Sequence, residues 1–175
     1  MKKIYIVLSF TGTVLSRIIK FYTKNEFAHV SVALDEELEE MYSFGRLNPY
    51  NPILGGFVHE GINRGTFKRF WRTRAKIFSL EVTNKQYDKL RKTIEYFKEN
   101  KEKYKFNLIG LACVGINKRI VRKNTLYCAE FVRHVLKSAG ITVINDLPKM
   151  IKPEDFKNLK GTEVEYEGPL RKYKR

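Results

Sequence analysis

The sequence has few of the residues that build covalent or metal-bound scaffolds. Of its 175 residues only two are cysteine, Cys113 and Cys128, and only three are histidine. Two cysteines are too few for a disulfide framework, and their spacing is not that of a metal site. We therefore expect a reduced, cytoplasmic protein that is held together by its hydrophobic core, with no cofactor and no metal.

Long hydrophobic segments are also missing. The apolar run from Ile4 to Phe10 follows two lysines, like the start of a signal peptide, but it is short and leads to Arg17 without a cleavage site. No other run approaches the roughly 18 apolar residues that read as a membrane-spanning helix. We predict that residues 4–10 form a buried strand and that the chain has no transmembrane segment.

Acidic residues are scarce relative to basic ones, 19 against 34, which leaves a formal net charge of +15. A charge of this size produces a positive field that suits an anionic surface or ligand. The lysines are spread nearly evenly, however, and the basic and aromatic stretches 68–72 and 171–175 match no recognised nucleic-acid module. The charge therefore indicates either an anionic partner or only a well-solvated surface.

Hydrophobic residues are plentiful, at 43% of the chain, which is enough for one domain over residues 1–175 with a substantial core. The segments that alternate or are rich in β-branched residues predict an α+β fold with a curled antiparallel sheet of about five strands. Strands are predicted over residues 4–10, 28–34, 41–45, 57–62 and 76–82, with a loop at 48–56.

Helical spacing of apolar residues marks the segments between and after these strands. The clearest helix covers residues 127–139, with Thr125 as the expected N-cap and Gly140 in the stop position. A second helix follows the cap residues Thr83 and Asn84. Shorter helices are predicted at 14–19 and 107–116, and the tail from residue 153 is predicted to be mostly loop and short strand.

Cys128 falls in the first turn of the predicted helix 127–139. The unpaired N–H groups and the dipole of a helix N-terminus favour a thiolate there and can also hold an oxyanion. The alternative is that Cys128 is only a small core residue facing Phe131 and Val132. Cys113 lies in an apolar segment and is expected to be inert core.

A thiol nucleophile needs a histidine base and a third polar group that orients the imidazole. His134 follows Cys128 by six residues on the same helix, about 240° around the axis, and is expected to point away. His59 adjoins Glu60 in a predicted strand, and His29 lies in the middle of another strand among small residues. Residue type and position alone therefore leave both His29 and His59 open to a structural or a catalytic role.

Two segments carry a resemblance to a known family. Residues 27–34, Phe-Ala-His-Val-Ser-Val-Ala-Leu, precede residues 127–132, Tyr-Cys-Ala-Glu-Phe-Val. This order, with the histidine strand before the cysteine helix, resembles the circularly permuted branch of the NlpC-type papain-like hydrolases, in which papain's order is reversed. The likeness covers most of the chain, because further segments resemble a bacterial group in that branch. These segments are residues 11–13, 41–46, 55–58 and 153–156, together with Asn107 and Gly110.

The resemblance implies a permuted papain-like fold, in which a half-barrel sheet packs on the cysteine helix. It also implies that Cys128 attacks the carbonyl of a peptide, amide or ester while His29 takes and returns the proton. The family draws its third residue from a strand next to the histidine strand, and the candidates are Glu60 and Ser43. Glu60 is preferred because a carboxylate fixes the imidazole tautomer and stabilises the imidazolium.

The reaction and the substrate stay open at this point. Relatives with the permuted order include lecithin retinol acyltransferase-like enzymes, so acyl transfer or thioester hydrolysis on a lipid is the second hypothesis. A basic binding protein on an inactive scaffold is the third. Tyr127 either lines the site or packs at the helix start, and each of Arg46, Arg64 and Arg69 is either a clamp for a substrate carboxylate or a solvated charge.

Overall fold

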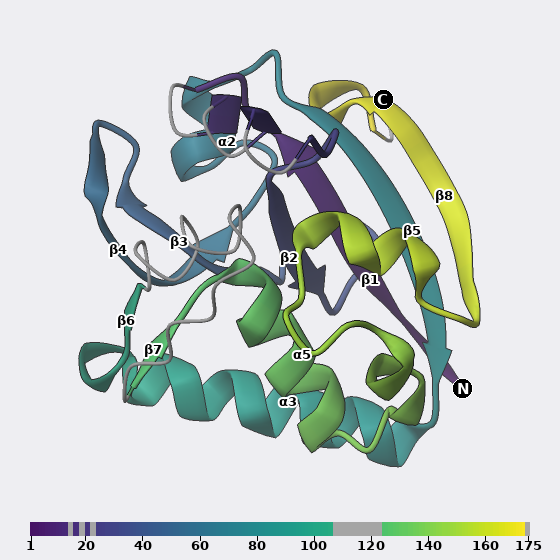
Figure 1. Ribbon diagram of the computed structural model, residues 1–175. Helices are drawn as coiled ribbons and strands as arrows, with labels where there is room; N and C mark the ends of the chain where they lie inside the picture. Colours follow the sequence, from purple (N-terminus) through teal and green to yellow (C-terminus); the bar gives the residue numbers. More distant parts are fainter. Residues whose placement is uncertain (14–15, 18–19, 22–23, 107–123, 174–175) are drawn as a thin grey trace.

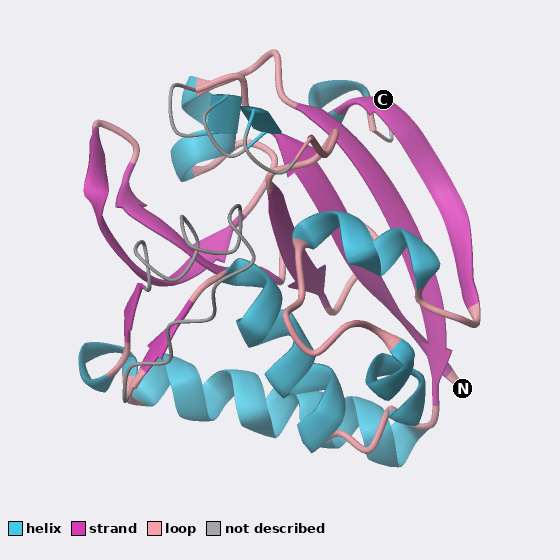
Figure 2. Cartoon of the chain, viewed as in Figure 1, coloured by secondary structure: helices cyan, strands magenta, loops and turns pink. Residues whose placement is uncertain are grey.

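The computed structural model describes residues 1–13, 16–17, 20–21, 24–106 and 124–173. Within these residues the chain is an α+β protein built on one six-stranded antiparallel sheet, with the strand order β4-β3-β2-β1-β5-β8 (Figures 1 and 2). The strands are β1 Lys2–Phe10, β2 His29–Ala33, β3 Met41–Asn48, β4 Asn51–Glu60, β5 Arg74–Val82 and β8 Thr162–Pro169.

Strand β1 lies in the middle of the sheet, between β2 and β5. Ile4, Ile6 and Leu8 are fully buried on one face, and Tyr5 and Val7 are buried on the other. A strand that is covered on both faces is expected to be continuously apolar, which is why this segment shows no polar alternation. The predicted buried strand at the N-terminus is confirmed.

Helices α3 (Asn84–Glu99) and α5 (Cys128–Ser138) cover one face of the sheet and contact each other (Figure 2). Thr83 caps α3 as predicted, since its hydroxyl accepts from the Gln86 N–H at 3.2 Å and its own N–H donates to the Gln86 side chain. Phe97 of α3 and Phe131 of α5 meet Phe44 of the sheet in one aromatic cluster. This cluster fixes α5 against β2 and β3.

The opposite face carries a smaller core. Phe67 of the short helix α2 (Gly65–Arg69) packs there with Val7 and Ala33 of the sheet, and Leu170 and Tyr173 close it from the C-terminal side. The remaining short elements are the parallel pair β6 (Lys105–Phe106) and β7 (Thr125–Leu126) and the 3-10 turns Lys101–Lys103, Thr142–Asp146, Pro153–Asn158 and Leu170–Lys172.

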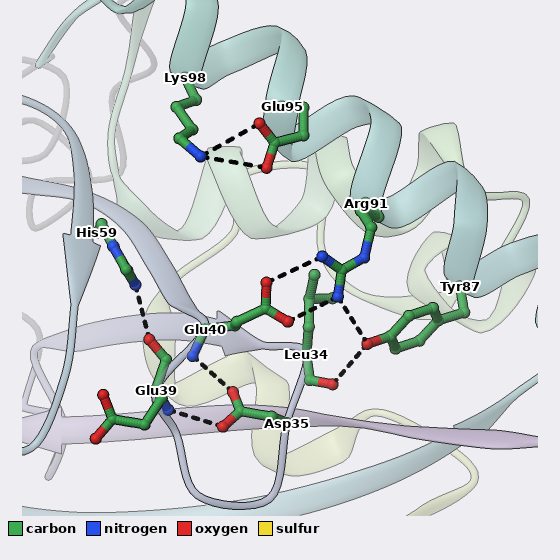
Figure 3. Close-up of polar contacts among 9 residues, drawn as sticks. All are labelled: Leu34, Asp35, Glu39, Glu40, His59, Tyr87, Arg91, Glu95 and Lys98. Atoms are coloured by element: carbon green, nitrogen blue, oxygen red, sulfur yellow. Dashed lines mark hydrogen bonds and ion pairs between the residues drawn. The ribbon is translucent and has the colours of Figure 1, made fainter.

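The turn between β2 and β3 is tied to α3 (Figure 3). The Tyr87 hydroxyl donates to the Leu34 carbonyl at 2.9 Å, and the Arg91 guanidinium donates to both carboxylate oxygens of Glu40 at 3.0 and 2.7 Å. Asp35 closes the turn by accepting from two backbone N–H groups. These bonds hold the β2–β3 hairpin in place, and β2 carries His29.

Three sequence expectations are wrong in detail. Residues 51–56 are not loop but the first part of β4, and Pro52 is tolerated because β4 is an edge strand. The tail contributes the eight-residue strand β8, which brings the sheet to six strands where about five were expected. Thr125 lies in β7, and the N-cap of α5 is Tyr127.

Two predicted helices fall partly or wholly outside the residues that the structure describes. The helix expected at 14–19 lies partly outside the described residues, and the helix expected at 107–116 lies wholly outside them, together with Cys113. Gly140 does end the last helix, with the positive φ of 79° that suits a helix stop. Among the described residues no helix is both long enough and apolar enough to cross a membrane.

Candidate active site

His29 is the first residue of β2, and its imidazole faces a carboxylate on β4. The Nε2 atom of His29 lies 3.0 Å from Oε1 and 3.3 Å from Oε2 of Glu60, the last residue of that strand. Because Ser31 is two residues along β2, its side chain emerges on the same face as His29, and its hydroxyl donates to Oε2. The carboxylate therefore binds two groups from one strand.

Glu60 is a buried charge with several partners, being only 8% exposed. Burial raises the pKa of its carboxyl, but the positive charge of His29 and the hydrogen bonds from His29 and Ser31 outweigh burial, so the pKa is lowered overall. Hydrogen bonds to the charged form of a carboxylate favour that form. Glu60 is thus held as an anion next to the imidazole.

The imidazole of His29 responds in the opposite direction. Burial lowers its pKa, but the charge of Glu60, the thiol of Cys128 and the hydrogen bond to Glu60 together raise it to about 10. His29 therefore carries a proton at neutral pH, and its Nε2–H donates to Glu60. The ring is held in one orientation with one nitrogen committed to the carboxylate.

Cys128 is the first residue of α5, directly after the N-cap Tyr127. The Tyr127 N–H donates to the Glu130 carboxylate at 3.3 Å, and the Tyr127 hydroxyl donates to the Ile151 carbonyl at 2.8 Å, which fixes the start of the helix. Cys128 lines the same pocket as His29 and contributes to the raised pKa of the imidazole. The Nε2 atom of His29 is taken by Glu60, and Nδ1 is not.

Cys128, His29 and Glu60 line one pocket. Cys128 is only 1% exposed, and its sulfur is reached from this pocket. At the first position of α5, the backbone N–H of Cys128 has no partner within the helix. An N–H group at a helix N-terminus beside a nucleophile is suited to stabilising an oxyanion.

Other pocket residues were not expected from the sequence. Ser9 of β1 pairs with His29 across the sheet, and its buried hydroxyl has no hydrogen-bond partner among the described residues. Phe67 and Phe106 supply apolar walls, and Gly45 lies directly against the imidazole. The positions of Ser9 and Gly45 next to His29 follow from the register of the strands. This register cannot be derived from a single sequence.

Gly45 leaves room for the His29 ring. A Cβ at this position would lie 3.3 Å from Cε1 of His29 and 3.6 Å from Oε1 of Glu60. We expect Gly45→Ala to displace the ring from Glu60 and to lower the pKa of His29, measured by NMR titration of the imidazole. The rate of Cys128 alkylation is expected to fall about tenfold, because small misplacements of reacting groups are costly.

Gly56→Ala is the matched control for this substitution. Gly56 is the cross-strand partner of Gly45, but its added Cβ would meet only the Leu47 side chain, at an ordinary 3.5 Å. Its imidazole titration and alkylation rate are expected to match those of the unsubstituted protein. Equal effects of the two substitutions would show that any added methyl group in this hairpin disturbs the site, and would contradict the role given to Gly45.

The other sequence candidates lie elsewhere. His59 is exposed, stacks on Tyr42, and lies 2.7 Å from the Glu39 carbonyl, in the network around the β2–β3 turn (Figure 3). His134 is exposed and packs edge-on against Phe97. The buried Tyr127 does not line the pocket, so its role is packing at the helix start.

The described residues offer no metal site, because no group of three or more His, Cys, Asp or Glu side chains among them is placed to hold an ion. Comparison with protein-family models, with curated proteins and with solved structures finds no match for this chain.

Proposed function

We propose that this protein is a cysteine hydrolase, a peptidase or amidase that cleaves an amide or peptide bond through a thioacyl intermediate. The observation that supports this most directly is the convergence of Cys128, His29 and Glu60 in one pocket, with the cysteine at the first position of a helix. In this proposal Cys128 is the nucleophile, His29 the general base and acid, and Glu60 the group that orients the imidazole.

The proposed reaction has two halves. The Cys128 sulfur forms a bond to the carbonyl carbon, and the C–N bond breaks while the protonated His29 gives its proton to the leaving amine. Water then adds to the thioacyl carbon as His29 takes a proton from it, and the C–S bond breaks to release the acid and restore the thiolate beside the protonated imidazole. An imidazolium next to a cysteine favours the thiolate, which is the attacking species.

The proposal extends to the fold family and the cellular setting. A curled antiparallel sheet packed on the cysteine-bearing helix, with the histidine on a strand that precedes this helix in sequence, is what the permuted papain-like arrangement requires. The sheet and the helix support that assignment, which remains part of the proposal. The reduced, cytoplasmic setting expected from the two cysteines also belongs to it.

Acyl transfer or thioester hydrolysis on a lipid is the second candidate, because the same thiol and imidazole serve that chemistry. The observation that favours it is the exposure of several aromatic side chains, among them Phe21, Tyr50 and Trp71, which are 79%, 78% and 53% exposed. Such side chains suit an apolar or interfacial partner. Vesicle binding that persists at high salt would favour this candidate, since simple electrostatic attraction is screened.

Thiol alkylation tests the proposed function without a known substrate. Iodoacetamide is expected to modify Cys128 much faster than Cys113 below pH 8, with both sites quantified by mass spectrometry of peptides. His29→Ala is expected to slow the modification of Cys128 about tenfold or more, because the charged partner of the thiolate is lost.

His59→Ala serves as the matched control, since it removes a strand histidine that has no contact with the pocket. Its labelling rate is expected to equal that of the unsubstituted protein. Equal and slow labelling of both cysteines would instead support the third hypothesis, a basic binding protein on an inactive scaffold.

A further inference from the structure

A second pocket opens beside the active site, and its walls are strongly basic. Four arginines line it, and none of the described lining residues is acidic. Its aromatic lining comes from Phe10 at the end of β1 and from the segment that follows α2. We call this the arginine pocket, defined by Arg17, Arg69, Arg72, Arg74, Phe70 and Trp71.

The positive charge of the arginine pocket is largely uncompensated. Among the described residues Arg74 has a carboxylate partner, Glu26, at 3.9 Å, and the side chains of Arg17, Arg69 and Arg72 have none. Arg69 instead lies 3.6 Å from the ring centroid of Tyr50. Such cation–π stacking holds a guanidinium in place without neutralising it.

The basic character continues into the active site. Thr11 lines both pockets, so the two adjoin. Arg46, on the active-site side, donates to the Thr13 hydroxyl at 2.6 Å, and its guanidinium lies 6.0 Å from the Phe70 ring. Burial lowers the pKa of Arg46, and repulsion by the nearby charge of Arg69 lowers it further. A bound anion would relieve this repulsion.

We propose that the arginine pocket binds a phosphate group of the substrate while the scissile carbonyl lies at Cys128. A single carboxylate is matched by one guanidinium fork, whereas a phosphate presents more oxygens and up to two charges and engages several arginines at once. Because Thr11 lines both pockets and Arg46 lines the one that holds Cys128, such a group would occupy the pocket that adjoins the active site. This inference rests on the proposed function, because it assigns the anion to the substrate of that site.

The phosphate can come from a soluble compound or from a lipid headgroup. Trp71 lines the pocket, and Tyr50 stacks on Arg69 at its edge; both rings are more than half exposed. Exposed aromatic rings beside arginines suit a headgroup at a membrane surface, and they also suit stacking on a flat soluble ligand. The chemistry recognised by the arginines is the same in the two cases.

Direct binding of inorganic phosphate is the first test. Titration calorimetry compares phosphate with acetate at equal ionic strength, using the whole chain and the double variant Arg69→Gln/Arg72→Gln. Phosphate is expected to bind in preference to acetate, and the double variant is expected to bind phosphate at least about tenfold more weakly. Equal binding of acetate, or undiminished binding of phosphate by the variant, would overturn the inference.

The control variant removes the same amount of charge elsewhere. Lys85 and Lys89 are exposed on α3, and Lys85→Gln/Lys89→Gln lowers the net charge by two without touching either pocket. Its phosphate affinity is expected to equal that of the unsubstituted protein. If it weakens binding as much as the arginine variant does, the anion is held by the general field of the protein and not by the arginine pocket.

The outcome is independent of the hydrolase proposal. Cys128→Ala is expected to bind phosphate with unchanged affinity, because the arginines do not depend on the sulfur. Absence of phosphate binding in a protein whose Cys128 is rapidly alkylated would overturn only this inference. Phosphate binding in a protein whose Cys128 is inert would overturn the proposed function and, with it, the assignment of the anion to a substrate.

Two further arms identify the source of the phosphate. Glycerol 3-phosphate is titrated as the soluble form, and phosphatidylcholine vesicles with and without phosphatidic acid are tested by co-sedimentation. Vesicle binding that requires phosphatidic acid and is competed by inorganic phosphate supports the lipid source. Binding of glycerol 3-phosphate without vesicle binding supports the soluble source, and the absence of both would overturn the proposal.

Discussion

Cys128→Ala is expected to reduce the hydrolysis of any substrate of this protein to the background rate, a loss of roughly a thousandfold or more. The sulfur is the atom that forms the thioacyl bond in the proposed reaction, and a thiolate is a far stronger nucleophile at neutral pH than the serine and threonine hydroxyls that also line the pocket. The measurement is product release from a panel of amide, peptide, ester and thioester substrates, with wild-type protein and variant assayed side by side.

Cys113→Ala provides the control with the same chemical change. Its activity is expected to equal that of the wild type, since Cys113 was predicted from the sequence to be inert. A thioacyl adduct on Cys128, seen as a mass increase on the peptide that contains it, would add direct evidence for the intermediate. Full activity in Cys128→Ala would contradict the proposed mechanism whichever substrate is used.

The elements with strong local signals were predicted well. A pattern within a few residues is enough to predict each of them: the buried strand β1, the alternating strands β2 and β5, and the capped helix α3. Strand β1 is continuously apolar because both of its faces are buried, and the side chains of the other elements alternate or recur at the spacing of their own secondary structure. Local sequence is sufficient to predict an element when the pattern of its buried side chains matches the repeat of a helix or a strand.

The elements that depend on distant partners were missed. The first half of β4 contains proline and glycine, and it is a strand because it pairs with β3 at the edge of the sheet. Strand β8 is mostly exposed, and it exists because β5 offers it an unpaired edge. Propensity says little about such strands, since cross-strand pairing supplies their stability.

In the candidate site, too, some residues could be predicted from local sequence and others depend on distant strands. Cys128 and His29 were selected by residue type, position and family resemblance, and the preference for Glu60 over Ser43 agrees with its contact to the imidazole. Two features of the site could not be predicted: the Ser9 hydroxyl, which has no hydrogen-bond partner among the described residues, and the close approach of Gly45 to the imidazole. Both follow from how β1 and β3 lie against β2, which is a property of the assembled sheet.

The pairing of His29 with Glu60 predicts a characteristic pH dependence of stability. The folded-state pKa of His29 is raised from 6.5 to about 10, so its contribution is fully present below pH 6.5 and is lost as the pH rises towards 10. The pKa of Glu60 is lowered from 4.5, so its contribution is present above pH 4.5 and is lost as the pH falls below that value. The pair therefore contributes most to the stability of the fold between pH 4.5 and pH 6.5.

We expect the free energy of unfolding to fall by about 2–4 kcal/mol on the alkaline side of this window through the loss of the His29 proton alone. Urea unfolding over a series of pH values measures the fall. Glu60→Gln removes the charge that holds the proton on His29. A plot of its free energy of unfolding against pH is therefore expected to be lower than that of the wild type between pH 4.5 and 6.5 and flatter above pH 6.5.

His59→Gln isolates this effect from the titration of other groups. It changes an exposed histidine that contacts the Glu39 carbonyl and not the pocket, so its stability curve is expected to run parallel to that of the wild type. Subtracting the variant curves from the wild-type curve removes the lysine and tyrosine contributions common to all three. A wild-type curve that parallels Glu60→Gln above pH 6.5 would show that Glu60 does not hold the imidazolium, and the proposed orienting role of Glu60 would then be wrong.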